Sequence, residues 1–424
     1  MPEESVNRPQ VVVVGCGFGG LAATQSLAEV GVDVTVIDRE NHHTFQPLLY
    51  QVASAGLNPS DIAQPIRHVI RKQKNARVLL DEVTGVDLEA HTVETVGDVV
   101  AFDYIVLATG ATHSYFGNDD WVQFAPGLKS IDDALEIRRR ILLAFERAEV
   151  TRDPAERERL MTFVIVGAGP TGVELAGAVK EIATKTLRAD FRSIDTTTSR
   201  VILIEAGPRV LAAFPEKLSA SAERQLTKLG VEVRTSSPVT NIDADGVETE
   251  DASIAAATVL WGAGIAASPL GRNVSGDVDR AGRVPVSDEL TLANHPNVFV
   301  IGDLAAMTSD GKPVPGVAPA AQQGGRHVAR CVEADLDGSP RPTFAYKDKG
   351  SMATIGRSKA VADLGPRLRF GGFLAWLVWW AVHILTLIDF RSKASAMASW
   401  GWQYATGQRI ARLITGVEHE SIDS

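Results

Sequence analysis

The sequence predicts an α/β protein with two Rossmann-like dinucleotide-binding domains and a helical, tryptophan-rich C-terminal region. Three observations carry this prediction. Glycines at 15, 17 and 20 follow a β-branched run, glycines at 167, 169 and 172 follow a second one, and five of the seven tryptophans fall between residues 376 and 402. A glycine turn between strand and helix lets a pyrophosphate approach the backbone, and the helix N-terminus attracts its charge.

A carboxylate completes each glycine motif. Asp38 ends the predicted strand at 32–38, and Glu205 ends the one at 201–205. A carboxylate at this place can bind the hydroxyl groups of a ribose. A single glycine turn has a plain structural reading, but two complete copies indicate that the chain binds two dinucleotides.

Three further predicted strands end in glycine. Thr109 and Gly110 close the strand at 103–111, Gly264 closes 258–264, and the pair at 302–303 closes 297–303. Each could be an ordinary turn. Beside a nucleotide, however, glycine permits close approach, and the aspartate at 303 can accept hydrogen bonds from a hydroxylated chain. His42 and His43 are adjacent and lack ligand spacing, so no metal site is predicted.

Composition limits the alternatives. The 424 residues are 45% hydrophobic and 22% charged, which describes a globular protein of two or three domains. A formal net charge of −10 argues against a nucleic-acid partner. Cys16 lies in the first glycine turn and Cys331 in a predicted helix, so a structural disulfide is not expected and a reducing compartment is favoured. No Cys-x-x-Cys pair provides a redox-active disulfide. The start at 1–5 has no basic or apolar leader pattern, so secretion is not expected.

The C-terminal region has a different character. Residues 371–388 carry no formal charge apart from possible protonation of His383. Without the two leading glycines a helix there is about 24 Å long, short of the roughly 30 Å bilayer core. Ile410, Leu413 and Ile414 are expected to share a helical face with Trp402, with Arg412 pointing away. We predict that residues 371–415 lie on a membrane surface. A core helix, a homodimer contact and a true span are the alternatives.

Together these residues resemble the type II NADH dehydrogenases, the single-subunit NADH:quinone oxidoreductases, over essentially the whole chain. The glycine motifs alone would indicate only the wider group of two-dinucleotide flavoproteins. The stretches that narrow the resemblance are 45–53 (FQPLLYQVA), 108–110, 167–177, 302–303, 317–324 (VAPAAQQG), 350–360 (GSMATIGRSKA) and the tryptophan-rich tail.

The resemblance implies FAD in the first site and NADH in the second, with the NADH domain inserted into the FAD domain. The implied limits are 1–122 and 287–345 for FAD, 123–286 for NADH, and 346–424 for membrane anchoring or dimerisation. The residues implied for FAD are Gly15, Gly17, Phe18, Gly19, Gly20, Asp38, Arg39, Gln46, Pro47, Thr109, Gly110, Gly302 and Asp303. Those implied for NADH are Gly167, Gly169, Pro170, Thr171, Gly172, Glu205, Ala263 and Gly264.

The resemblance also implies catalytic residues. Glu174 matches a glutamate that faces the nicotinamide and flavin region, although an acidic residue in the first turn of a helix has a structural reading too. The family's quinone segment carries two glutamines. Gln323 matches the second, but Pro319 stands in place of the first, so Gln322, Gln323 or backbone groups would have to bind the quinone. Glu174 and Gln323 are the predicted catalytic residues.

The implied activity is hydride transfer from NADH to FAD and two-electron transfer on to a membrane quinone, without proton pumping, at the cytoplasmic face of the cell membrane. Glu205 should exclude NADPH by repelling its 2′-phosphate, although Arg209 lies near it in sequence. A soluble reductase of a small redox protein is the main alternative, and a redox sensor that turns over slowly is another. Sulfide:quinone chemistry is disfavoured because two distant cysteines do not supply it.

Overall fold

The computed structural model describes residues 8–415, which form two compact units. The first contains the described residues up to 44, with 63–112 and 265–349, and the second contains 45–62, 113–264 and the described residues from 350 onward. This division reflects packing and not cofactor binding, so the domain limits at 122, 286 and 345 stay a prediction. The N-terminal stretch 1–5 lies outside the described residues.

A six-stranded sheet forms the centre of the first unit, in the order β20-β21-β9-β1-β2-β5. The strands are β1 (Gln10–Val14), β2 (Asp33–Asp38), β5 (Ala76–Leu80), β9 (Tyr104–Leu107), β20 (Thr291–Leu292) and β21 (His295–Val300). All neighbours are parallel except β20 and β21. The valines at 11–14 are almost completely buried, as expected for the central strand of a sheet covered on both faces.

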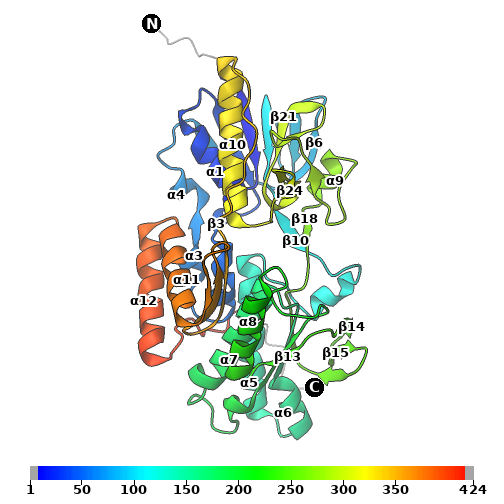
Figure 1. Ribbon diagram of the computed structural model, residues 1–424, viewed down its shortest axis with the longest axis vertical. Helices are drawn as coiled ribbons and strands as arrows, with labels where there is room; N and C mark the ends of the chain where they lie inside the picture. The colour runs from blue at the N-terminus through cyan, green and yellow to red at the C-terminus, as the bar shows by residue number, and fades with distance from the viewer. Residues whose placement is uncertain (1–7, 416–424) are drawn as a thin grey trace. The chain divides into compact units, whose positions relative to one another are not determined.

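Two helices of the first unit, α1 (Phe18–Ser26) and α10 (Ala318–Asp337), pack side by side (Figure 1). A Cβ on Gly325 would lie 2.2 Å from the carbonyl oxygen of Gly19, so the two backbones touch where glycine leaves room. The smaller elements are β3 (His42–Thr44), β4 (Ala63–Pro65), α4 (Ile66–Val69), β6 (Val83–Asp87), β7 (Thr92–Thr95), β8 (Val99–Ala101), β10 (Ala111–His113), β18 (Ile265–Ala267), α9 (Leu270–Val274), β19 (Val284–Pro285), β22 (Ala305–Ala306), β23 (Thr308–Ser309) and β24 (Lys312–Pro313).

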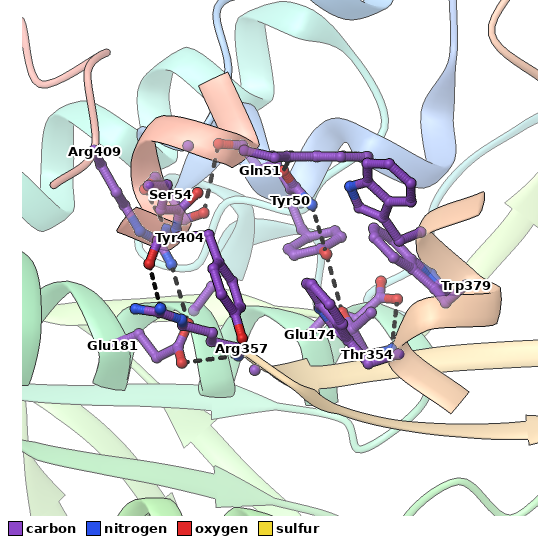
Figure 2. Close-up of a pocket in the computed structure, with 17 residues that line it drawn as sticks. Tyr50, Gln51, Ser54, Glu174, Glu181, Thr354, Arg357, Trp379, Tyr404 and Arg409 are labelled. Carbon is purple, nitrogen blue, oxygen red and sulfur yellow. Dashed lines mark hydrogen bonds and ion pairs between the residues drawn. The ribbon is translucent and has the colours of Figure 1, made fainter. Parts of the chain in front are cut away.

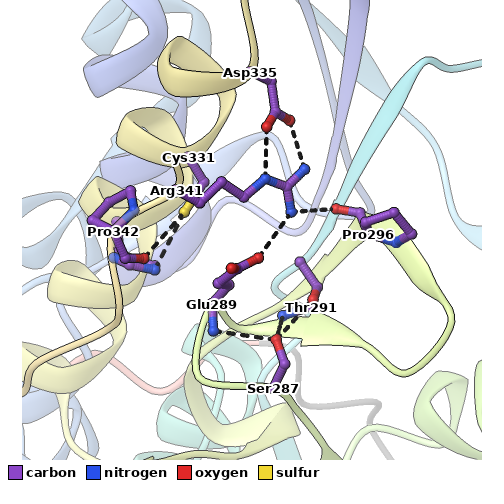
Figure 3. Close-up of polar contacts among 9 residues, drawn as sticks. Ser287, Glu289, Thr291, Pro296, Cys331, Asp335, Arg341 and Pro342 are labelled. Carbon is purple, nitrogen blue, oxygen red and sulfur yellow. Dashed lines mark hydrogen bonds and ion pairs between the residues drawn. The ribbon is translucent and has the colours of Figure 1, made fainter. Parts of the chain in front are cut away.

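An arginine whose side chain is 11% exposed ties the end of α10 to the sheet (Figure 3). The guanidinium of Arg341 donates to both carboxylate oxygens of Asp335, at 2.7 and 2.5 Å, and to the carbonyl of Pro296 at 2.7 Å. Cys331 is buried nearby on α10, and both it and Cys16 are unpaired. The absence of a structural disulfide between them is therefore confirmed.

The second unit is built around a four-stranded parallel sheet in the order β13-β12-β11-β17. Its strands are β11 (Thr162–Val166), β12 (Arg200–Ile204), β13 (Glu232–Arg234) and β17 (Thr258–Trp261). The helices of this part are α5 (Ile131–Val150), α6 (Pro154–Leu160), α7 (Pro170–Glu181) and α8 (Glu216–Leu229), and a small antiparallel sheet is formed by β14 (Val239–Ile242), β15 (Gly246–Thr249) and β16 (Ser253–Ala255). The two Rossmann-like sheets confirm the predicted fold class.

A second antiparallel sheet packs directly on α7. It consists of β25 (Ser351–Gly356), β26 (Lys359–Asp363) and β27 (Arg369–Gly371). A Cβ on Gly177 would lie 1.7 Å from the carbonyl oxygen of Ile355, so only glycine lets α7 and β25 come this close. Two short helices from the segment at 45–62, α2 (Leu49–Ala53) and α3 (Pro59–Ile62), also belong to this unit.

The tail forms two neighbouring helices, α11 (Phe373–Thr386) and α12 (Phe390–Thr406), orange and red in Figure 1. Gly407 ends α12 in the left-handed region, with φ of 75°. The chain after 407 is not helical. The prediction of one helical face shared by Trp402, Ile410, Leu413 and Ile414 is therefore wrong. A glycine C-cap terminates a helix at this kind of position.

Among residues 8–415, no helix has both the length and the apolar character needed to cross a bilayer. The tail nevertheless exposes many large apolar side chains. They are Phe373, Leu374, Leu377, Val382, Leu385, Ile388, Met397, Trp402, Ile410 and Leu413, and we call them the apolar tail surface.

Candidate functional site

The first glycine loop follows β1. Gly15 has a φ of 90°, which favours glycine, and a Cβ there would lie 2.7 Å from the carbonyl oxygen of Ala108. A Cβ on Gly20 would lie 1.8 Å from the carbonyl oxygen of Gly15, so Gly20 lets α1 pack against the turn. Gly17 is different, because its Cβ would meet nothing within 4 Å. Two glycines therefore serve packing, and the third leaves open space at the helix N-terminus.

The second loop repeats this geometry. Gly167 has a φ of 95°, and a Cβ on it would lie 2.4 Å from the Cα of Ala263. Gly172 would place a Cβ 1.8 Å from the carbonyl oxygen of Gly167, and Gly169 would meet nothing within 4 Å. Pro170 opens α7, where a missing N–H costs no hydrogen bond.

The two predicted carboxylates have equivalent contacts. Asp38 accepts a hydrogen bond from the backbone N–H of Cys16 at 2.5 Å, and Glu205 accepts one from Ala168 at 2.7 Å. Cys16 and Ala168 each stand between the first two glycines of their loops. Burial raises the pKa of Asp38, although the N–H groups of Cys16 and Glu40 lower it. Each carboxylate is thus fixed at the edge of its own loop.

The other predicted nucleotide residues lie at strand ends or beside the loops. In the first unit, the hydroxyl of Thr109 is buried and has no hydrogen-bond partner among the described residues. Gly110 and Gly302 have φ of 68° and 70°, and Asp303 stands in the short helix Gly302–Leu304. Phe18 and Gly19 begin α1, while Arg39 is exposed. In the second unit, Gln46 and Pro47 open the short helix Gln46–Leu48, Thr171 follows Pro170, and Gly264 lies against Ser114.

The predicted quinone glutamines lie in α10. The amide nitrogen of Gln323 donates to the carbonyls of Pro319 and Lys347, at 3.1 and 3.0 Å, and its oxygen accepts from the N–H of Lys347 at 2.9 Å. Gln323 therefore holds the chain at 347. Gln322 is half-buried.

A cavity that opens to solvent lies within the second unit (Figure 2). Its walls come from α2, α7, β25 and the tail. The lining residues are Tyr50, Gln51, Ser54, Gly56, Glu174, Ala178, Glu181, Thr354, Gly356, Arg357, Trp376, Trp379, Trp380, Trp400, Gln403, Tyr404 and Arg409. Five aromatic rings from the tail face a group of polar side chains, an arrangement typical of sites for amphipathic ring compounds.

A directed chain of hydrogen bonds runs along one wall of this cavity. The indole N–H of Trp400 can only donate, and it donates to the amide oxygen of Gln51. The amide nitrogen of Gln51 then donates to the hydroxyl of Tyr50 at 2.9 Å. Tyr50 in turn lies 2.9 Å from the hydroxyl of Thr354. In this last contact either hydroxyl can donate its proton to the other.

The other wall of the cavity is charged. Arg409 is 5% exposed, donates to the carbonyl of Ser54 at 2.5 Å and pairs with Glu181 at 3.6 Å. Glu181 also binds Lys185 and the backbone N–H of Arg357, both at 2.8 Å. Burial lowers the pKa of Arg409, while the carboxylate of Glu181 raises it. Tyr50, Arg409 and the tail tryptophans were not predicted to line a binding site. Tyr50 lies in the 45–53 stretch, and the tryptophans were expected at a membrane surface, whereas Trp379 and Trp400 are buried.

Glu174 is the predicted catalytic residue that lines this cavity. It stands in the first half of α7, and the N–H of Thr354 donates to its carboxylate at 3.4 Å. Burial raises its pKa to about 8, against a smaller lowering by the Thr354 N–H. Glu174 therefore holds a proton at neutral pH.

Replacing Glu174 by glutamine is expected to remove a pH dependence of stability. A folded-state pKa of about 8, above the ordinary value of 4.5, means that this residue's contribution to stability is fully present below about pH 4.5 and lost as pH rises through 8. The wild type should lose stability relative to Glu174→Gln by up to about 1.4 kcal/mol per pH unit in that window. Urea unfolding at pH 5.5, 7 and 8.5 measures this, with exposed Glu216→Gln as the control. Parallel pH profiles for wild type and Glu174→Gln would contradict it.

Two glycine loops, each with its own parallel sheet and carboxylate, define a protein of the two-dinucleotide oxidoreductase class. The family model of the pyridine nucleotide-disulphide oxidoreductases matches residues 9–325, and that of the NDH2 C-terminal domain matches 349–408. Because the first model covers most of the chain, the class is established.

Relatives narrow it further. The chain is 46% identical to the type II NADH:quinone oxidoreductases Ndh and NdhA of Mycobacterium tuberculosis, covering 96% and 98% of this chain and 90% and 91% of those proteins. NDH2 from Plasmodium falciparum, solved in complex with NADH, has the same fold, with a TM-score of 0.86 at 20% identity over 95% of this chain and 99% of that one. This chain belongs to the type II NADH:quinone oxidoreductases.

Proposed function

We propose that this protein transfers a hydride from NADH to FAD and two electrons from the flavin on to a quinone, without pumping protons. Family membership supports the reaction. One structural observation supports two separate nucleotide sites, because the glycine loop with its carboxylate occurs twice, once in each unit. Both loops fit a dinucleotide, because Gly17 and Gly169 leave space at a helix N-terminus where a side chain would stand. FAD, when bound, supplies the hydride- and electron-accepting chemistry.

The first loop holds FAD in this proposal, with Asp38 on a ribose and with Thr109, Gly110 and Asp303 alongside. The second loop holds NADH, with Glu205 opposing a 2′-phosphate. The guanidinium of Arg209 donates to the carbonyls of Phe214 and Ala212, at 2.9 and 2.7 Å. These bonds engage Arg209 within its own loop, so fewer of its N–H groups are free to bind a 2′-phosphate.

The quinone ring binds in the cavity of the second unit. Aromatic rings supply its apolar walls, and the hydroxyl of Tyr50 and the carboxyl of Glu174 supply polar contacts for its oxygens. The net reaction, NADH + H⁺ + quinone → NAD⁺ + quinol, consumes one proton. Glu174 holds a proton at neutral pH, with its pKa of about 8, and is suited to provide it. Quinone binding by Gln322 and Gln323, and the catalytic role of Gln323, remain a proposal.

The protein works at a membrane, on its cytoplasmic face. The apolar tail surface supports this proposal, because many large apolar side chains exposed on α11, on α12 and in the segments next to them favour the lipid boundary. Pairing of two chains through the same surface is the alternative that a measurement of mass in detergent would reveal.

Anaerobic reduction tests the function. NADH should bleach the flavin absorbance, and NADPH should do so at least about a hundredfold less efficiently, because two like charges near 4 Å repel by a few kcal/mol at a protein surface. A soluble ubiquinone or menaquinone analogue should then restore the absorbance. Bleaching without reoxidation by either quinone would remove the quinone assignment, and equal efficiency of NADPH would remove the role of Glu205.

A further inference from the structure

His43 is a buried histidine beside the first glycine loop that the reaction described above does not use. It lies in β3 and is 2% exposed. Its Nδ1 lies 2.8 Å from the carbonyl oxygen of Cys16. A carbonyl oxygen only accepts, so Nδ1 carries the proton. Burial lowers the pKa of the imidazole, which keeps the ring neutral and leaves Nε2 as a hydrogen-bond acceptor.

That acceptor is unsatisfied. Nε2 of His43 is buried and has no hydrogen-bond partner among residues 8–415. The ring packs edge-on against Phe18, the first residue of α1, with 5.2 Å between the centroids. An unsatisfied buried polar atom destabilises a fold and calls for a specific reason. The imidazole therefore carries an acceptor at the helix N-terminus that the polypeptide itself does not satisfy.

The second loop shows that holding the turn does not require an imidazole. There the equivalent carbonyl, that of Ala168, accepts a hydrogen bond from the backbone N–H of Leu211 at 2.8 Å. A backbone N–H thus suffices to satisfy this carbonyl. In the first loop the same donor function is performed by His43, and the ring adds an acceptor that a backbone N–H lacks.

A second unsatisfied polar atom lies beside the same loop. The buried hydroxyl of Thr109 also has no partner among the described residues. Thr109 borders the turn, because a Cβ on Gly15 would stand 3.2 Å from its Cα. Two buried polar atoms beside one glycine turn, both without a hydrogen-bond partner among the described residues, indicate a ligand with hydrogen-bonding groups of its own.

We propose that His43 is a binding residue for the dinucleotide of the first loop and accepts, through Nε2, a hydrogen bond from one of its hydroxyl groups. The assignment rests on the proposed function, in which this dinucleotide is FAD. Pyrophosphate oxygens only accept hydrogen bonds and cannot pair with an acceptor. The ribose and ribitol hydroxyls of FAD can donate and flank its pyrophosphate, whereas the N–H donors of its adenine and flavin rings lie at the two ends of the molecule. The hydroxyls are therefore the partners that fit beside the glycine turn.

Two substitutions separate this role from a structural one. In His43→Asn the amide nitrogen can replace Nδ1 and keep the bond to Cys16, but the distal acceptor is lost. In His43→Gln the longer side chain can present its amide oxygen where Nε2 stood, but the bond to Cys16 is lost. A ligand-binding role predicts weaker FAD binding by the asparagine variant, whereas a purely structural role predicts more damage in the glutamine variant.

The measurement is the Kd of FAD for deflavinated full-length protein, from quenching of flavin fluorescence. His43→Asn should raise this Kd about tenfold, the effect of losing one hydrogen bond and leaving its donor unpaired, while His43→Gln should stay within about threefold of wild type. His42→Asn, on the half-buried neighbour, is the matched control. Thermal unfolding of each apoprotein, and NADH binding to its second loop, confirm that the variants fold.

The outcomes divide clearly. Equal FAD affinity in the asparagine and glutamine variants, or weaker binding by the glutamine variant, overturns the role of His43. If the wild-type apoprotein binds no FAD while still binding NADH, the proposed function fails at the first loop and this role fails with it. That result is distinguishable from weaker FAD binding in the asparagine variant alone, which supports the role of His43.

Discussion

Gly17→Ala is expected to yield a folded protein that no longer retains FAD. Gly17 has φ of −68° and ψ of −161°, a conformation open to alanine, and its Cβ would meet no protein atom within 4 Å. The apoprotein should gain about 0.4–1 kcal/mol from reduced freedom of the unfolded chain. The methyl group would, however, fill the space where the pyrophosphate approaches. We expect FAD affinity to fall by roughly a hundredfold or more, as severe overpacking implies.

Gly169→Ala should have the same effect at the other site. Its φ and ψ, −68° and −177°, are again open to alanine, with no atom near the added Cβ. This variant should stay yellow but respond to NADH only at concentrations about a hundredfold higher. The flavin spectrum of purified protein, followed by titration with NADH, distinguishes the two variants. Loss of FAD from Gly169→Ala with retention by Gly17→Ala would reverse the assignment of the sites.

The third glycine of each motif provides the control. Alanine at 20 or 172 would place a Cβ 1.8 Å from a carbonyl oxygen of its own loop. These variants should therefore have a lower thermal midpoint even without bound nucleotide. Stable Gly20→Ala protein with normal FAD content would show that the turn is looser than the geometry requires.

The two loops were predictable because local backbone geometry determines their glycines. A left-handed turn, a close helix contact and an open helix N-terminus each require glycine at a set position, and the carboxylates Asp38 and Glu205 follow at the end of the next strand. The parallel sheets could also be predicted from local sequence, because the valine and isoleucine runs are short and apolar throughout.

The cavity could not be predicted, because its residues come from four distant segments. Tyr50, Glu174, Thr354 and Trp400 are neighbours only because Gly177 brings α7 onto β25 and the tail folds back on them. The unsatisfied Nε2 of His43 is likewise a property of the fold, since sequence shows the imidazole but not its partners. The end of α12 was locally encoded by Gly407, yet the apolar spacing of the residues after it suggested a continuing helix.

Arg409 is the residue of the tail whose removal should affect stability most. It is almost completely buried, and its guanidinium joins the non-helical segment after α12 to Glu181 on α7 and to the carbonyl of Ser54. Arg409→Ala should reduce the free energy of unfolding by about 3–5 kcal/mol, the usual cost of breaking a buried pair by removing one partner. Urea unfolding followed by tryptophan fluorescence measures this directly, because the tail carries five of the seven indoles.

Arg412→Ala is the matched control three residues further on. Arg412 pairs with Asp190, and both side chains are about one-third exposed, so its loss should cost at most about 1 kcal/mol. The double variant Arg409→Met, Glu181→Met should be more stable than Arg409→Ala, because it removes both buried charges, while Lys185, which also loses Glu181 as its partner, is 41% exposed and stays hydrated. If Arg409→Ala were no more harmful than Arg412→Ala, the tail would owe its position to the packing of its tryptophans and not to this ion pair. The cavity would then persist without Arg409.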